Sequence, residues 1–245
     1  MGENRIYFKD NWGLFIGSFT NNLPHKHYAI QLSISLGSDI IIFNGSKKLY
    51  HHKSYLIKSN VSHRMTCKEE QLLLLFYPTS TTGHFLKEFS KDNISEFKHP
   101  IVEKLKQNSL NYINGITSFE NAVTEISDSL KKFICECEEQ NHFDDERIIK
   151  ALKYLDENVE RVIPLKEMAE KCYLSESRFL HLFKEKTGIT YRKVQQWNKV
   201  SQSFSMIKKQ SLTETAHQFG FADSAHYTKV FKDTFGFNPK RIQKI

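Results

Sequence analysis

The chain has 245 residues, a formal net charge of +7, 39% hydrophobic residues and four cysteines, which is enough for two domains with separate cores. No apolar run approaches the roughly eighteen residues of a transmembrane helix, and no signal-peptide pattern opens the chain, so we expect a soluble, cytoplasmic protein without membrane contact. The cysteines form no CxxC pair and no zinc-ligand spacing, which excludes a disulfide framework and a zinc finger as expectations.

Residues 1–90 are expected to form a β domain. Between Tyr28 and Leu36, apolar residues alternate with small or polar ones, which is typical of a half-buried strand. Asn44-Gly45 is a hairpin turn signal. Two further strands are predicted at Asp39–Phe43 and Gln71–Tyr77. Many short strands joined by turns indicate a small barrel or jelly roll.

Residues 91–142 are expected to be helical. An apolar stripe with steps of four and three, as in a heptad pattern, is formed by Phe119, Val123, Ile126, Leu130, Phe133 and Cys137. The stripe spans less than three heptads, so packing on the β domain and self-association are both open interpretations. The acidic run Glu136–Glu146 has few apolar residues and is predicted to be the interdomain linker.

Two segments near the C-terminus, Leu165–Gly188 and Leu212–Gly236, repeat one pattern. Each begins with a Leu-x3-Ala step, crosses a short break and restarts at an N-cap residue, which is Ser175 in the first copy and Asp223 in the second. Both halves of each copy carry apolar residues at helical spacing. Two short helices joined by a tight turn form a helix-turn-helix, and its second helix would turn a polar face outward.

Residues 190–209, between the two copies, carry apolar residues at steps of three and four. As one continuous helix they would be roughly 30 Å long, while one turn of B-DNA is about 34 Å. Such a helix could hold two recognition helices against successive major grooves of one duplex. A helical scaffold that binds other proteins is the alternative reading of the repeat.

The basic charge of the chain is concentrated in its C-terminal part. Residues 146–245 contain 19 Lys and Arg against 11 Asp and Glu, whereas residues 1–145 contain 16 against 17. Lysines and arginines that neutralise phosphates supply most of the non-specific affinity for a duplex. We therefore expect double-stranded DNA as the partner.

The second copy carries a long and specific motif, from Ala216 to Tyr227 and on through Phe231-Lys232 to Gly236 and Pro239. With it, residues 143–245 resemble the AraC/XylS family of bacterial transcription regulators, and the first copy fits the family's less distinctive first motif. The resemblance implies a seven-helix domain with helix-turn-helix motifs at 165–188 and 212–236, and a protein that is not an enzyme.

Carried over by position, the resemblance implies two sets of contacts with DNA. The base-reading candidates are Ser177, Leu180 and His181 in the first motif, and Ser224, Ala225, His226, Thr228 and Lys229 in the second. The phosphate-contact candidates, each of which is otherwise a solvated surface cation, are Arg178, Lys184, Arg192, Lys193, Lys232, Lys240 and Arg241. Many family members have arginine where His181, Lys229 and Lys199 stand. Because Arg makes a bidentate contact with guanine that neutral His cannot make, the target sequence does not follow from relatives.

The segment Pro24–Leu32, together with Ser62-His63-Arg64, resembles the cupin-like sensor domain that precedes some AraC-type regulators. His25 and His27 are two residues apart and share a strand face, and cupins often bind a metal through such a pair and a distant histidine such as His63. The glutamate of the cupin motif is missing, and Ile30, Gln31 and Leu32 occupy that region. A metal site, a metal-free ligand pocket and structural histidines are the three interpretations, and we expect no metal and no cofactor.

The sequence thus predicts an α+β protein with two domains, a cupin-like β-barrel or jelly roll with a helical region and an all-α domain with two helix-turn-helix motifs. We expect a sequence-specific DNA-binding transcription regulator that is controlled by a small-molecule effector or another signal at the N-terminal domain. In related regulators a helix like that at 119–137 often makes the dimer contact, which favours a homodimer. Activation through RNA polymerase is the commoner mode in the family, although no residue separates activator from repressor. The alternative is a cupin-type metal-binding protein or enzyme with an appended helical domain.

Overall fold

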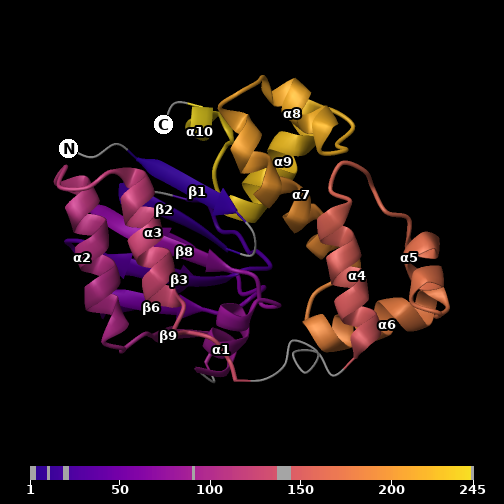
Figure 1. The fold of residues 1–245 in the computed structure, drawn as a ribbon, viewed down its shortest axis with the longest axis horizontal. Helices are drawn as coiled ribbons and strands as arrows, with labels where there is room; N and C mark the ends of the chain where they lie inside the picture. The colour runs from indigo at the N-terminus through magenta and orange to yellow at the C-terminus, as the bar shows by residue number, and fades with distance from the viewer. Residues whose placement is uncertain (1–3, 10–11, 19–21, 90–91, 137–144, 244–245) are drawn as a thin grey trace. The chain divides into compact units, whose positions relative to one another are not determined.

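The structure is a computed structural model that describes residues 4–9, 12–18, 22–89, 92–136 and 145–243 (Figure 1). The chain forms two compact units: unit 1 comprises Met1–Cys135 with Phe235–Phe237, and unit 2 comprises Glu136–Thr234 with Asn238–Gln243. Unit 1 combines sheets with helices, and the described part of unit 2 is entirely helical, so the predicted α+β architecture with two domains is confirmed. Across the described residues, no helix is both long and apolar enough to cross a membrane.

Unit 1 contains two antiparallel sheets. The larger has the strand order β1 (Arg5–Lys9), β2 (Trp12–Ser18), β8 (Glu70–Phe76), β3 (Ile30–Ser35), β6 (Ser54–Ile57) and β9 (Ile94–Glu96). The smaller has the order β5 (Lys47–His52), β4 (Ile40–Asn44) and β7 (Arg64–Thr66). The three predicted strands and the hairpin turn at Asn44-Gly45 are confirmed, with Gly45 at a φ of 60° between β4 and β5. The described strands divide between two sheets and do not close into one barrel.

Both faces of the larger sheet are covered. Three helices, α1 (Thr81–Phe89), α2 (Ile101–Ile113) and α3 (Phe119–Leu130), bury one face together with Ile30, Leu32 and Ile34 of β3. On the other face, Tyr55 and Ile57 of β6 form a second core with residues of the smaller sheet. All six residues of β3 are therefore buried, and the expectation of a half-buried strand is wrong because the smaller sheet covers its second face.

The apolar stripe that begins at Phe119 packs inside unit 1. Val123, Ile126, Leu130 and Phe133 belong to the core that lies against the larger sheet, and Figure 1 shows α2 and α3 side by side on that sheet. The stripe is thus not a free surface for self-association, and packing on the β domain is the interpretation that holds. Cys137 and most of the predicted linker, residues 137–144, lie outside the described residues.

Two other expectations for unit 1 are wrong in detail. The region 91–142 also contains β9, which pairs with β6, because Ile94–Glu96 adds a sixth strand at the sheet edge. Residues 81–89 are helical instead of β, because they form a short amphipathic helix with Leu86 buried against the sheet.

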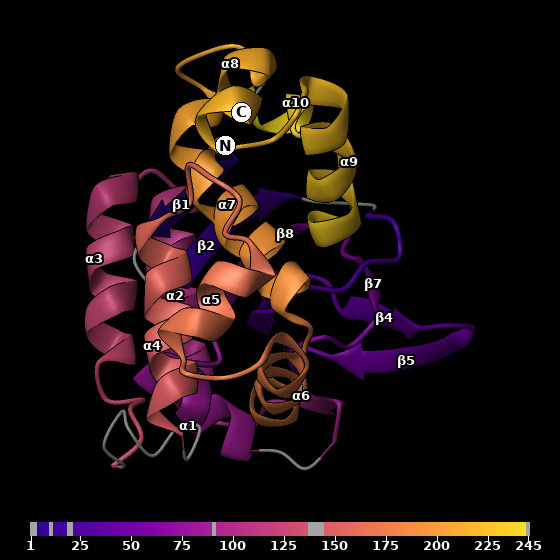
Figure 2. The same cartoon turned by 90° about the vertical axis from the view of Figure 1, so that its right-hand side faces the viewer.

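Unit 2 has seven helices among the described residues, in agreement with the family resemblance (Figure 2). They are α4 (Glu146–Glu157), α5 (Leu165–Lys171), α6 (Glu176–Thr187), α7 (Tyr191–Ile207), α8 (Leu212–Gln218), α9 (Ser224–Phe235) and α10 (Lys240–Gln243). Trp197 on α7 is buried and Phe204 is half-buried, so the apolar residues at steps of three and four face the core of unit 2. The helix α7 has 17 residues and is therefore about 25 Å long, shorter than expected. It ends at Ile207 because the amides of Lys209 and Gln210 both bond to the carbonyl of Met206 in a terminal turn.

Candidate nucleic-acid interface

The two repeated segments each form two helices joined by a short turn, α5 with α6 and α8 with α9. The turn from Cys172 to Ser175 has four residues, and the turn from Phe219 to Asp223 has five. Each turn holds one residue in the left-handed region, Tyr173 with a φ of 55° and Gly220 with a φ of 64°. Gly220 adopts this conformation without the steric cost that a side chain would bring.

The second helix of each motif begins at the predicted N-cap. The hydroxyl of Ser175 accepts a hydrogen bond from the amide of Arg178 at 3.3 Å, and the carboxylate of Asp223 accepts one from the amide of His226 at 2.7 Å. Each cap satisfies a free N–H group of the first helical turn. These caps fix where α6 and α9 start and hence which side chains face outward.

On α6, the inward face is apolar and the outward face is free of the core. Phe179, Leu182 and Phe183 are buried. The three base-reading candidates on this helix are exposed, and they are Ser177, Leu180 and His181. The Nδ1 atom of His181 lies 3.6 Å from a carboxylate oxygen of Glu185, and Leu180, at 41% exposure, is apolar and suited to a thymine methyl group.

On α9, the base-reading candidates differ in exposure. Ala225, His226 and Lys229 are exposed, whereas Ser224 and Thr228 are half-buried. The inward face is held in place by Tyr227, whose hydroxyl lies 2.8 Å from the hydroxyl of Ser203 on α7. The ring of His226 packs edge-on against Phe221, with 5.4 Å between the ring centres. Lys229 therefore extends from the outward face, while His226 lies at the edge of that face.

All seven phosphate-contact candidates are exposed, and they lie on α6, α7, α9 and α10. Within the part of the chain that the structure describes, no ion pair involves six of them, which are Arg178, Lys184, Arg192, Lys193, Lys232 and Lys240. Other cations of unit 2 are paired, since Arg161 lies 2.6 Å from a carboxylate oxygen of Glu167. The guanidinium group of Arg161 and the hydroxyl of Tyr154 lower the pKa of Glu167 to about 2.

Lys199 has a structural role that sequence reasoning missed. Its ammonium group is buried and donates hydrogen bonds to the carbonyl oxygens of Phe219 and Gly220, at 2.9 and 3.2 Å. It thereby holds the turn of the second motif on α7. Burial lowers the pKa of Lys199 to about 8. Nothing in the sequence pattern could reveal this contact, because the partners lie 20 and 21 residues away.

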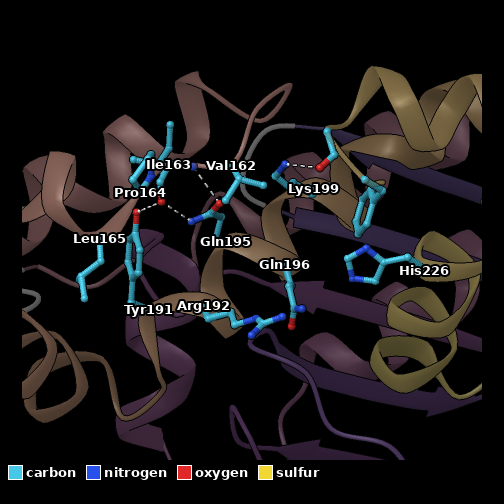
Figure 3. A pocket seen from close by; sticks show the side chains of 12 residues that line it. Val162, Ile163, Pro164, Leu165, Tyr191, Arg192, Gln195, Gln196, Lys199 and His226 are labelled. Carbon is cyan, nitrogen blue, oxygen red and sulfur yellow. Dashed lines mark hydrogen bonds between the residues drawn. The ribbon is translucent and has the colours of Figure 1, made fainter. Parts of the chain in front are cut away.

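An apolar hollow of about 340 Å³ opens beside α7 within unit 2. Figure 3 shows Arg192 and Gln196 from α7 on one side of it and His226 from α9 on the other. The carbonyl oxygen of Ile163 accepts hydrogen bonds from the hydroxyl of Tyr191 and the side-chain amide of Gln195. These bonds hold together the part of the lining that these three residues form. The hollow thus separates the start of α5 from the second motif.

The three N-terminal histidines, which the sequence singled out as ligand-pocket candidates, are brought together in unit 1. His25, His27 and His63 are all buried, and His25 and His63 form an isolated antiparallel bridge. Burial lowers the pKa of all three rings, and that of His25 falls to about 3. The side chain of Gln31 reaches both His27 and His63, at 3.0 and 3.3 Å. In the sequence, Gln31 is only one of the residues that stand where the cupin glutamate is missing, and its contact with both rings was not foreseen.

Residues 168–245 match the family model described as a helix-turn-helix domain. LumQ of Photobacterium leiognathi, a probable transcriptional regulator, is 20% identical over 226 residues, which cover 89% of this chain and 90% of that protein. The transcriptional activator RhaS of Escherichia fergusonii is 22% identical over 219 residues, which cover 86% of this chain and 78% of that protein.

Solved structures resemble this chain over nearly its whole length. An apo variant of ToxT from Vibrio cholerae has a TM-score of 0.63 at 10% identity and covers 97% of this chain and 98% of its own. ToxT bound to an unsaturated fatty acid has a TM-score of 0.58 at 13% identity and covers 96% of both chains. At such identities the likeness shows the fold. The motif of the second copy, the matched domain family and the regulators among the relatives together show that residues 168–245 of this chain form an AraC-type helix-turn-helix domain and that the chain is similar to DNA-binding transcription regulators.

Proposed function

We propose that the chain regulates transcription by inserting α6 and α9 into adjacent major-groove segments of one DNA duplex. The observation that carries the proposal is that both helices start at a fixed N-cap and turn a polar or cationic face away from the core of unit 2. Recognition helices of helix-turn-helix proteins present base-reading side chains in this way.

The packing of α7 supports the two-groove arrangement. Phe179 of α6 packs on Tyr191 at the start of α7, and Phe231 of α9 packs on Phe204 near its end, with ring centres 5.4 and 5.2 Å apart. Tyr191 and Phe204 are separated by about 20 Å along the helix axis, and a helix is about 10 Å thick. The two packing points on α7 thus separate α6 from α9 by more than half of the roughly 34 Å repeat of B-DNA.

We also propose residues 143–245 as the DNA-binding domain and unit 1 as a cupin-like sensor domain. The name of RhaS, a transcriptional activator, favours activation, and we propose contact with RNA polymerase as its route. The fatty acid bound to ToxT favours control by a small apolar effector at unit 1. We expect a homodimer that forms through a surface other than the Phe119 stripe, because unit 1 buries that stripe.

The test is genome-wide mapping of bound DNA followed by binding of the full chain to the recovered site at several salt concentrations. We expect one bipartite site whose halves are one helical turn apart, and an affinity that falls steeply with salt because phosphates are neutralised. Replacing Arg192 and Lys193 together with alanine should reduce the slope of log affinity against log salt by about two.

The matched control is Lys153→Ala, which removes a charge from the exposed surface of α4, where the lysine lies near Glu157. It should leave the salt slope unchanged. A protein with no preferred site, or with a single protected groove in footprinting, would contradict the proposed mode of binding.

A further inference from the structure

Three histidine rings of unit 1 converge in its interior. Their ring centres are 4.4 to 5.6 Å apart, and each ring offers one nitrogen such that these nitrogens all lie within 4.8 Å of one another. His25 and His27 come from the segment before β3, and His63 comes from the segment before β7. The rings therefore join a strand of the larger sheet to a strand of the smaller one.

The hydrogen bonds of the rings define which nitrogen carries the proton. The Nδ1 atoms of His25, His27 and His63 each lie 2.9 Å from a backbone carbonyl oxygen, those of Leu23, Ala29 and Val61. A carbonyl oxygen can only accept, so each Nδ1 is the protonated nitrogen. In a neutral ring, Nε2 then carries a lone pair. A backbone carbonyl that holds Nδ1–H in this way is the usual outer support of a metal-binding histidine.

Gln31 adds an oxygen to the same centre. Its amide nitrogen donates to the hydroxyl of Ser33 at 2.9 Å, which turns the amide oxygen toward Nε2 of His27 and Nε2 of His63. An amide oxygen and two ring lone pairs then face one another, which is unfavourable unless a cation lies between them. Without a cation, the amide must turn over so that its NH2 group faces the rings.

We propose that His25, His27 and His63 bind one divalent first-row transition-metal ion, with Gln31 as an oxygen ligand. Neutral imidazole suits zinc, iron, nickel and copper, and the absence of a thiolate among these four ligands disfavours a soft monovalent ion. Three atoms no more than 4.8 Å apart have a common point within about 2.8 Å of each. Zinc–nitrogen bonds are about 2.0–2.1 Å long, so the rings need to move by less than about 1 Å.

The proposed ion would cross-link the two sheets of unit 1. Gln31 belongs to β3, in the middle region of the larger sheet, and His63 directly precedes β7 of the smaller one. Because an ion that binds only the folded state stabilises it, unit 1 should melt at a higher temperature with the ion than without it. This inference concerns unit 1 and does not depend on the proposed mode of DNA binding.

The test uses the full chain, stripped with a chelator and titrated with cobalt(II) chloride and, separately, zinc sulfate. We expect one ion per chain by elemental analysis and visible absorption bands from cobalt bound to nitrogen. His63→Ala should weaken binding by at least about 100-fold. The control variant replaces His51 and His52, the other closely spaced pair of histidines in the sequence, with alanine and should still bind one ion.

A second variant keeps the experiment decisive if His63→Ala does not fold. Gln31→Glu supplies a carboxylate in place of the amide oxygen and should bind the ion at least as tightly as the natural chain. Weaker binding in Gln31→Glu, or no ion bound by the natural chain at micromolar concentrations, would overturn the proposal. Ion binding that survives in a folded His63→Ala protein would overturn it as well.

Discussion

Gly220 is the residue on which the turn of the second motif depends. Its φ is 64°, and an added Cβ would lie 2.5 Å from Nζ of Lys199 and 2.6 Å from the backbone oxygen of Glu160. Tyr173 adopts a similar φ in the first motif but is 92% exposed. The first turn can accept a side chain because that side chain points into solvent. In the second turn, the ammonium group of Lys199 occupies the space that a side chain at position 220 would need.

We predict that Gly220→Ala lowers the free energy of unfolding of unit 2 by about 2 kcal/mol or more, because it combines left-handed strain with a clash. Gly188, at the end of α6, has a φ of 73° and no atom within 4 Å of an added Cβ. Gly188→Ala should therefore cost only about 1 kcal/mol. Urea denaturation measures both. Equal costs would mean that Lys199 and the Glu160 backbone move aside freely.

Asp156 on α4 lies in an unfavourable environment. Its Oδ1 atom is buried, with no hydrogen-bond partner among the described residues. Burial, together with the neighbouring Glu157, raises the pKa of Asp156 to about 7. In the unfolded chain the same carboxyl ionises near pH 4. Between these two pH values the folded state binds more protons, so this group reduces the stability of the fold as the pH rises from about 4 to about 7.

We predict that Asp156→Asn stabilises unit 2 by more than about 1 kcal/mol at pH 8, and by progressively less as the pH falls toward 4. Glu157→Gln should stabilise unit 2 less, because the side chain of Glu157 is 58% exposed and its charge only adds to the effect of burial on Asp156. Urea denaturation at a series of pH values measures the effect. A gain that is the same at pH 5 and pH 8 would mean that the carboxyl does not titrate in this range.

The two recognition helices share a scaffold but differ in what they offer to DNA. Lys229 of α9 is an exposed cation that can donate to guanine, whereas His181 of α6 lies beside Glu185 and donates one bond when neutral. The turns also differ by one residue in length. We therefore expect α9 to contribute more to recognition than α6.

We predict that Lys229→Ala weakens specific DNA binding about tenfold or more and relaxes the preference at one base position. His181→Ala should have a smaller effect on affinity, with the altered base about one helical turn away. Selection of bound sequences from a random pool measures both profiles, with Lys153→Ala as the control of equal charge. An unchanged profile for Lys229→Ala would exclude this lysine as a base reader.

At the scale of the whole molecule, charge and core are divided in the same way. The C-terminal residues 146–245 hold the positive excess, unit 1 buries two hydrophobic clusters, and the helices of unit 2 bury Phe179, Trp197 and Tyr227 among others. Separate cores favour separate cooperative unfolding.

We predict two unfolding transitions for the full chain in scanning calorimetry. Gly220→Ala should lower the melting temperature of one transition by several degrees and leave the other unchanged. Addition of the bound duplex should raise the same transition that Gly220→Ala lowers, because a ligand stabilises the part that binds it. A single transition in all samples would mean that the two units unfold together.

The sequence by itself determined the paired helices of the two repeats and the helix between them, the N-caps at Ser175 and Asp223, the hairpin at Asn44-Gly45 and the concentration of charge. These features depend on interactions within about four residues of the chain, which periodicity and capping patterns record. Sequence also identified the three histidines, since their type and spacing are visible without a fold.

Only the tertiary structure decided which surfaces meet. The second face of β3 is buried because another sheet covers it, and the Phe119 stripe is core because the larger sheet lies beneath it. Lys199 caps a turn 20 residues away, and Gln31 reaches His63 across 32 residues. Contacts over such distances depend on strand order and helix packing, which local patterns do not encode, and so the histidine centre became interpretable only once the chain was folded.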